Sequence, residues 1–493
     1  MNDTTNQEET MNQRFHNRNG NRSRLTVAAI CLVALLALPG RLSATTFSGS
    51  ITNAQSAGDD VILSSMTSSG AGTVTQTGGT WLYLDGTDSI GADVSANFGV
   101  LNNSYPTGSF TATQTAGTFS MLYWYLGAGS YILNNGTISN NGWFMQQGGQ
   151  FTMNNGTLNA NAIGISASGG GGFASGTTTM TFNGGKITSA GVLLAGNLAT
   201  VAGEHGVVVQ AAAATVAANG SGTGDSSPFR ISVANATSFG ESSYTIHGGS
   251  LTVNNGDTKI YQWGKLAGYG TVTTTSARTL DNSGKVVADG SGSDANVLNL
   301  SQYGTVLNST ENGTERTGAG WYAQNHGKVT LPSFAVAGGS STKTWGESTG
   351  DTTIDLVNSA RLAFTGVTGG TVAMSLLAPD RTDVPVNPRA TPIGVWDIDG
   401  SAFTFGGGSV ALTLRYDNTL VSDPSRLALF HYTGGQWQTV ASTIDPANFL
   451  ITGAGITSFS DFEVGVVPEP STILLFGLGG LLAWRKRGRT RQA

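Results

Sequence analysis

A turn signal followed by a polar and then a large apolar residue recurs along this chain at a nearly constant interval. The triplets that begin at Gly117, Gly136 and Gly156 read GTF, GTI and GTL, and they lie 19 and 20 residues apart. A further triplet, GTW, begins at Gly79, 38 residues before Gly117, which is two intervals of 19. Asn-Gly and Gly-Gly pairs precede several of these triplets, and both residue types tolerate the positive φ of a corner. The flanking residues alternate between apolar and polar, which is typical of strands with one buried face.

Short strands with a corner every 19–20 residues predict an all-β body, built over residues 45–365 as a parallel β-solenoid (β-helix) of stacked coils. The alternative that the pattern leaves open is an antiparallel sandwich or barrel, whose turns recur about every 8–12 residues. The high glycine content, 71 residues, and the low charge, 11%, suit a turn-rich β protein. The next Gly-Gly corner after Gly156 ends at Gly185, 29 residues on, which predicts an insertion near residues 169–172.

A second pattern supports the same fold farther along the chain. Residues 265–272 read KLAGYGTV, and Asn282-Ser283-Gly284 follows them. Together they resemble the passenger repeats of autotransporter-like β-helices, in which L-x-G-x-G-T-V precedes an Asn-x-Gly step. The family pattern continues with Pro-Gly, where this chain has Asp289-Gly290. The resemblance covers about 30 residues and implies a β-helix there.

The composition changes after about residue 365, and a separate module is predicted over residues 366–465. Four prolines cluster between residues 379 and 392, and alternating strand patterns follow at 410–416, 427–432 and 437–440. Thr433-Gly434-Gly435 predicts a hairpin between the last two. These features predict a small antiparallel β-sandwich-like module, which would cap the exposed edge of the solenoid against aggregation.

The first 44 residues read as a secretory signal peptide. Arginines between residues 14 and 24 precede a 14-residue apolar run at 25–38, and Leu42-Ser43-Ala44 supplies a small residue for cleavage. Export through the Sec translocon is therefore expected, with Met1 or Met11 as the start. The only cysteine, Cys31, lies in this leader. The exported body would then have neither disulfides nor zinc–thiolate sites.

The last residues, 466–493, combine a proline-containing stretch, a short apolar run and a cationic end. The 12 residues 473–484 would form a helix of about 18 Å, shorter than the hydrocarbon core of about 30 Å. The cations that follow would remain on the cytoplasmic side. We therefore predict a short C-terminal apolar transmembrane helix that anchors the chain only temporarily in a membrane.

These three parts, in this order and at the end of the chain, resemble a PEP-CTERM sorting signal. The resemblance implies that an exosortase, a membrane-bound transpeptidase-like enzyme, processes the exported chain near the Pro-Glu-Pro element. The sorting-signal residues are Val467, Pro468, Glu469, Pro470, Ser471 and Thr472, and the basic tail is Arg485, Lys486 and Arg487. The signal indicates a route to the cell surface or the extracellular space, and it does not indicate an activity.

Side chains that could carry chemistry are sparse. Between residues 100 and 200 only Lys186 is charged. Asp397 and Asp399 lie in a D-x-D-G turn sequence, and Asp289 and Asp294 flank a Gly/Ser-rich loop, so we interpret all four as turn residues. No two histidines have metal-ligand spacing, and no G-x-S-x-G element occurs. We therefore predict no catalytic residue, no metal and no cofactor.

The predicted function is that of a non-catalytic, exported matrix or biofilm protein, associated with exopolysaccharide. Residues 45–484 carry 14 cations against 27 acids, so nucleic acid is not an expected partner. Aromatic residues stack on sugars, and the candidate carbohydrate contacts are Tyr123, Trp124, Tyr125 and Trp143. The alternative is a β-helix polysaccharide lyase or glycosidase, whose acids would converge on one groove.

Overall fold

The structure is a computed structural model that describes most residues between 45 and 469. The described ranges are 45–53, 61–63, 66–76, 81–84, 87–90, 94–96, 100–102, 111–115, 118–121, 123–126, 130–146, 150–165, 177–195, 205–223, 226–232, 241–275, 278–308, 318–345 and 354–469. Before residue 130, side chains are described only at 113–115 and 118. The chain divides into two compact units, unit 1 (residues 1–287 and 298–319) and unit 2 (residues 288–297 and 320–493).

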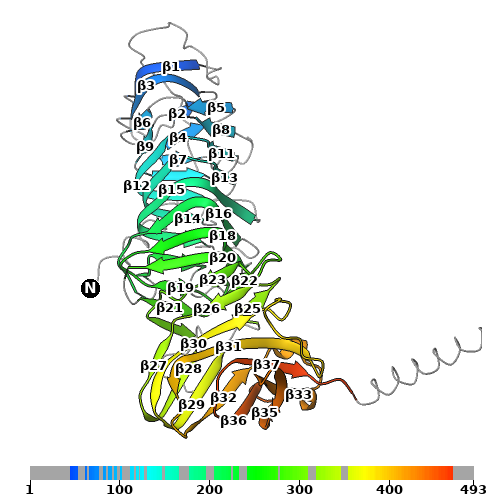
Figure 1. The fold of residues 1–493 in the computed structure, drawn as a ribbon. Coiled ribbons are helices and arrows are strands. Elements are labelled where there is room, and N and C mark those ends of the chain that lie inside the picture. Colours follow the sequence, from blue (N-terminus) through cyan, green and yellow to red (C-terminus); the bar gives the residue numbers. More distant parts are fainter. Residues whose placement is uncertain are drawn as a thin grey trace, which may run out of the picture. The chain divides into compact units, whose positions relative to one another are not determined.

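The described residues form strands almost throughout, which confirms the all-β prediction (Figure 1). The first strands are β1 (Thr45–Asn53), β2 (Val61–Leu63), β3 (Met66–Gln76), β4 (Trp81–Leu84), β5 (Thr87–Ile90), β6 (Val94–Ala96), β7 (Val100–Asn102), β8 (Thr111–Gln114), β9 (Thr118–Met121), β10 (Tyr123–Leu126), β11 (Ser130–Leu133) and β12 (Thr137–Gln146). They are followed by β13 (Gln150–Met153), β14 (Thr157–Ile165), β15 (Thr177–Ala195), β16 (His205–Ala218), β17 (Phe229–Ile231), β18 (Ser242–Val253), β19 (Thr258–Ile260), β20 (Gly264–Thr274), β21 (Thr279–Asn282), β22 (Lys285–Asp289), β23 (Val297–Asn299) and β24 (Thr305–Asn308).

The strands of unit 1 pair in parallel, and the pairing register equals the repeat interval in the sequence. Thr118 of β9 pairs with Thr137 of β12, and Thr137 pairs with Thr157 of β14. The next step is longer, because Thr157 pairs with Lys186 of β15 across 29 residues. Residues 169–172, where the insertion was predicted, lie outside the described residues. Strands that are not consecutive in the chain, such as β9, β12 and β14, therefore lie one above another in unit 1 (Figure 1).

The core of unit 1 consists of columns of apolar side chains, one from each successive strand. In one column every member is the register partner of the next, and all are fully buried. Its members are Ile138, Leu158, Ile187, Val216, Leu251 and Val272. Burial of each such side chain stabilises the fold by roughly 1.5–3 kcal/mol. The alternation along each strand therefore produces an aligned core when strands pair at the repeat interval.

The corners of unit 1 carry their own polar column. Asn154 Nδ2 donates to Asn134 Oδ1, and Asn183 Nδ2 donates to Asn154 Oδ1, both at 2.8 Å. At the next turn position Gly136 and Gly156 both have φ of +99°, a conformation that favours glycine. A Cβ at Gly156 would lie 2.5 Å from Gly136 O in the neighbouring strand. Close backbone stacking therefore requires the glycines that mark the repeat.

Unit 2 contains two antiparallel sheets. Its strands are β25 (Gly320–Gln324), β26 (Lys328–Thr330), β27 (Phe334–Val336), β28 (Gly339–Trp345), β29 (Ala360–Val367), β30 (Gly369–Leu377), β31 (Thr391–Thr404), β32 (Ser409–Arg415), β33 (Leu427–Thr433), β34 (Gln436–Val440), β35 (Ser442–Asp445), β36 (Leu450–Ile456) and β37 (Asp461–Val466). Two short 3-10 helices, η3 (Asn418–Leu420) and η4 (Pro424–Arg426), precede β33.

One sheet of unit 2 has the order β28-β29-β32-β36-β35. In the other, β30 pairs with β31, β31 with β37, β37 with β33, and β33 with β34. The hairpin predicted at Thr433-Gly434-Gly435 is confirmed, since Thr433 pairs with Gln436. The two sheets are in contact: Trp396 Nε1 of β31 donates to Asn358 O, and a Cβ at Gly453 of β36 would lie 2.5 Å from Leu429 Cδ2.

The loop between β30 and β31 packs against the β30–β31–β37–β33 sheet of unit 2. Val384 of this loop forms a buried cluster with Leu377 and Val395. Trp437 Nε1 donates to Pro385 O at 2.8 Å, which holds the proline-rich part of the loop. The prolines that precede β31 therefore belong to a loop that packs against the sheet.

Several predicted segments lie outside the described residues: the signal peptide at 1–44 and the apolar run at 473–484. Among the described residues, no helix has the length and apolar character needed to cross a membrane. The division into domains at residues 365 and 465 stays a prediction.

Candidate functional site

The start of the predicted sorting signal is held by a single arginine. Val467 N–H donates to Arg426 O at 2.9 Å, and Arg426 Nε donates to Val467 O at 3.0 Å. Arg426 Nη1 also lies 3.3 Å from Glu469 Oε1 as an ion pair. Residues 470–472 and the basic tail at 485–487 lie outside the described residues.

The aromatic residues proposed for sugar binding fall on two strands of unit 1. Tyr123, Trp124 and Tyr125 belong to β10, and their side chains lie outside the described residues. Trp143 of β12 is half-buried, whereas its neighbour Phe144 is fully buried and packs edge-on against Phe151 at 5.0 Å. Trp143 is therefore accessible to a ligand, and Phe144 is a core residue.

An open groove of about 510 Å³ lies in unit 2, between the end of β31 and the segment before β37. Its lining residues are Asp397, Ile398, Asp399, Gly400, Ser401, Phe405, Phe459 and Ser460. Phe405 and Phe459 pack together with ring centroids 5.0 Å apart. The groove thus combines carboxylates, hydroxyls and an aromatic wall, which are the groups that contact sugars.

One acid that lines this groove, Asp397, faces an acid of the neighbouring strand, Asp461, which is not itself a lining residue. Asp397 of β31 is the register partner of Asp461 of β37, so their Cβ atoms are about 4.5–5.5 Å apart. Lys328 Nζ lies 3.0 Å from Asp397 Oδ2. Burial, and next the negative charge of Asp397, raise the pKa of Asp461 to about 6. Asp461 therefore keeps its proton to a higher pH than an ordinary aspartate does.

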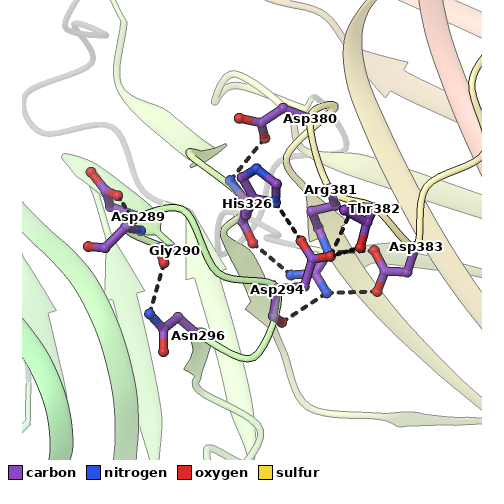
Figure 2. Close-up of polar contacts among 10 residues, drawn as sticks. Asp289, Gly290, Asp294, Asn296, His326, Asp380, Arg381, Thr382 and Asp383 are labelled. Atoms are coloured by element: carbon purple, nitrogen blue, oxygen red, sulfur yellow. Dashed lines mark hydrogen bonds and ion pairs between the residues drawn. The ribbon is translucent and has the colours of Figure 1, made fainter.

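A second polar cluster in unit 2 joins three segments that are far apart in the sequence. Figure 2 shows Asp294 facing both His326 and Thr382, with Arg381 beside them. His326 Nδ1 lies 2.8 Å from Asp294 Oδ1, and the Thr382 N–H donates to Asp294 Oδ2 at 3.0 Å. Hydrogen bonds from Thr382, and then from His326, hold the pKa of Asp294 near 2.

Arg381 is the centre of this cluster, and its side chain is only 4% exposed. Its Nε and Nη2 bind the two carboxylate oxygens of Asp383, at 2.8 and 2.7 Å. The remaining guanidinium hydrogen bonds go to backbone carbonyls, from Nη1 to His326 O and from Nη2 to Asp294 O. These contacts join the segments that contain Asp294, His326 and Arg381.

The interpretation of the acids as turn residues is right for Asp289 and wrong for Asp397 and Asp399, which lie inside β31 and pair with β30. Asp289 Oδ1 accepts from the Ser291 N–H at 2.9 Å. The interpretation is also wrong for Asp294, which binds partners 32 and 88 positions away. In the part of the chain that the structure describes, no group of three or more His, Cys, Asp or Glu side chains is arranged to hold a metal ion.

A buried carboxyl in β37 makes the stability of unit 2 depend on pH. Glu463 is 1% exposed, Asn387 Nδ2 donates to its Oε1 at 2.9 Å, and burial raises its pKa from 4.5 to about 7. Between these values the folded chain keeps a proton that the unfolded chain releases. The free energy of unfolding therefore falls as pH rises from about 4.5 to 7, by on the order of 2–3 kcal/mol. Asp461 acts in the same direction.

The measurement that checks this is urea unfolding of unit 2 at pH 4.5, 6 and 8, in the wild type and in Glu463→Gln. A glutamine keeps an oxygen for the Asn387 bond and has no proton to lose, so most of the slope should disappear. An unchanged slope in this variant would assign the pH dependence to other groups. The acids whose pKa is lowered, such as Asp294, lose their stabilising effect only below about pH 4.

The described residues form an all-β protein. Its last described strand, β37, leads directly into the predicted sorting signal. A family model described as the PEP-CTERM protein-sorting motif matches residues 466–487. The chain therefore carries this sorting motif, which implies an exosortase as its processing partner. It also implies a secreted protein that is processed at the membrane and displayed at the cell surface or in the extracellular space. No curated protein and no solved structure matches the chain.

Proposed function

We propose that this chain is a non-catalytic matrix protein, exported through the Sec translocon, held transiently at the inner membrane and then sorted by an exosortase. The observation that carries the proposal is the sorting motif at residues 466–487, which follows β37 without an intervening linker. In this proposal the body contributes bulk and surface to an extracellular or biofilm matrix and has no catalytic residue.

We further propose that unit 1 is a parallel β-solenoid similar to the passenger regions of autotransporter-like proteins. The parallel pairing at intervals of 19, 20 and 29 residues supports this fold, as do the aligned core columns. Exopolysaccharide is the proposed ligand of its surface. The half-buried Trp143 supports a sugar contact, and Tyr123, Trp124 and Tyr125 are proposed to extend it along β10.

The experiment is the intact mass of the protein recovered from the surface and the medium of its native host. We expect a mass that lacks the basic tail, because processing near Pro468-Glu469-Pro470 would remove the residues that follow this element. In a strain without exosortase activity the same protein should retain Arg485, Lys486 and Arg487. A tail retained in both strains would contradict sorting and would leave an anchored periplasmic protein.

A polysaccharide hydrolase is the second candidate, and the groove of unit 2 favours it. The facing carboxyls Asp397 and Asp461, with Lys328 beside them, fit an acid and a base at one site. This function requires release of reducing ends from the host's exopolysaccharide, and loss of that release in Asp461→Asn. The groove is in the antiparallel unit, so it differs from the β-helix active site that the sequence suggested as the alternative.

A further inference from the structure

The strand that leads into the sorting motif is paired on both sides. Val466, the last residue of β37, is the register partner of Thr391 in β31 and of Leu427 in β33. The motif match begins at residue 466. The first residue of the motif is therefore also the last residue of a central strand.

Arg426 binds Val467, the first residue after β37, and also contacts Glu469, two residues farther along the chain. Its backbone carbonyl accepts from Val467 N–H, its Nε donates to Val467 O, and its Nη1 pairs with Glu469. Arg426 is itself fixed by η4, where its N–H donates to Asp423 O at 3.2 Å. The backbone groups of Val467 are thus engaged, whereas the Glu469 side chain is 60% exposed.

Enzymes that cut peptide bonds bind several residues of substrate in an extended conformation, with the backbone available for new hydrogen bonds. The backbone groups of β37 and Val467 are not available for such hydrogen bonds, because they are already bonded within unit 2. Releasing them would require separation of β37 from both neighbours, which disrupts the centre of the sheet. The contacts beyond Val467 are an exposed ion pair, which opens at little cost.

We propose that the processing site lies on the C-terminal side of Val467 and that Arg426 is the positioning residue that sets this limit and slows engagement of the motif. This inference rests on the proposed sorting function. In the step, one peptide C–N bond breaks: the carbonyl side takes the hydroxyl of water, or the amine of an acceptor, and the amine of the released tail takes a proton. The mature chain then keeps all of β37.

The test uses the full chain expressed in its native host, with two readouts. The C-terminal residue of the mature protein is identified by mass spectrometry, and the rate of tail loss is followed by pulse-chase. We expect products that end at Val467 or later. Arg426→Ala, which removes the bonds to Val467 O and Glu469, should be processed about three- to fivefold faster.

Two variants keep the test specific. Arg426→Lys retains a cation near Glu469 and should fall between the wild type and Arg426→Ala. Arg389→Ala removes an exposed arginine of the same unit and should be processed at the wild-type rate. Hydrogen exchange of β37 in each variant separates a general loss of folding from release of the motif.

The possible results separate a failure of this inference from a failure of the proposed sorting function. A wild-type product that ends before Val467 would overturn the limit while leaving exosortase sorting in place. Equal rates for Arg426→Ala and the wild type would overturn the role of Arg426 alone. Absence of any tail removal in the wild type would overturn the sorting function and this inference together.

Discussion

Arg381→Met is expected to lower the free energy of unfolding of unit 2 by about 2–3 kcal/mol. The guanidinium is 4% exposed, so its charge is out of water and depends on Asp383 for compensation. Its removal leaves the carbonyl oxygens of His326 and Asp294 without their donor. Unsatisfied buried groups cost more than the bonds themselves contribute, which makes the loss large.

The measurement is urea-dependent hydrogen exchange of peptides from β30 and β31, the strands on either side of the loop that contains Arg381. Arg389→Met, an exposed arginine on the same loop, should change stability by less than about 0.5 kcal/mol. If Arg381→Met is no worse than this control, the cluster in Figure 2 does not hold the loop.

Gly156→Ala is expected to destabilise unit 1 by about 4 kcal/mol or more. Two effects add here: φ is +99°, and the new Cβ would lie 2.5 Å from Gly136 O. The oxygen belongs to backbone that is itself paired, so it cannot move away without shifting the register of β12 and β14. The loss should appear as faster hydrogen exchange in peptides from both strands.

Two substitutions separate these effects. Gly455→Ala in unit 2 has a positive φ of 73° but open space around the new Cβ, so it should cost only about 1 kcal/mol. Asn159→Ala, at an exposed position of β14, should be nearly neutral. A Gly156→Ala variant as stable as Gly455→Ala would mean that the neighbouring strand yields to the methyl group.

The interval between the Gly-Thr triplets predicted the register of unit 1 because its determinants are local. A glycine at each corner and alternation along each strand are sufficient to bring Thr137 beside Thr157. The same local chemistry identified the turn at Asp289 and the hairpin at Gly434.

The contacts that the sequence did not predict in unit 2 depend on pairing between segments that are far apart in the chain. The facing position of Asp397 and Asp461 follows from the register of β31 with β37, which no local pattern specifies. Arg381 binds carbonyls 55 and 87 positions away, and no local pattern in the sequence specifies these partners. A buried arginine looks the same in sequence as a solvated one.

The pairing of β37 on both sides also has a mechanical meaning. Any pull on the C-terminal end of the chain enters unit 2 through Val466 and is carried along the strand. The load then falls on two rows of hydrogen bonds in shear, together with the buried side chains of Phe462 and Val464. A terminal strand at a sheet edge would peel open one bond at a time. A central strand resists as a unit, so a pull on the sorting motif is opposed by both neighbouring strands at once.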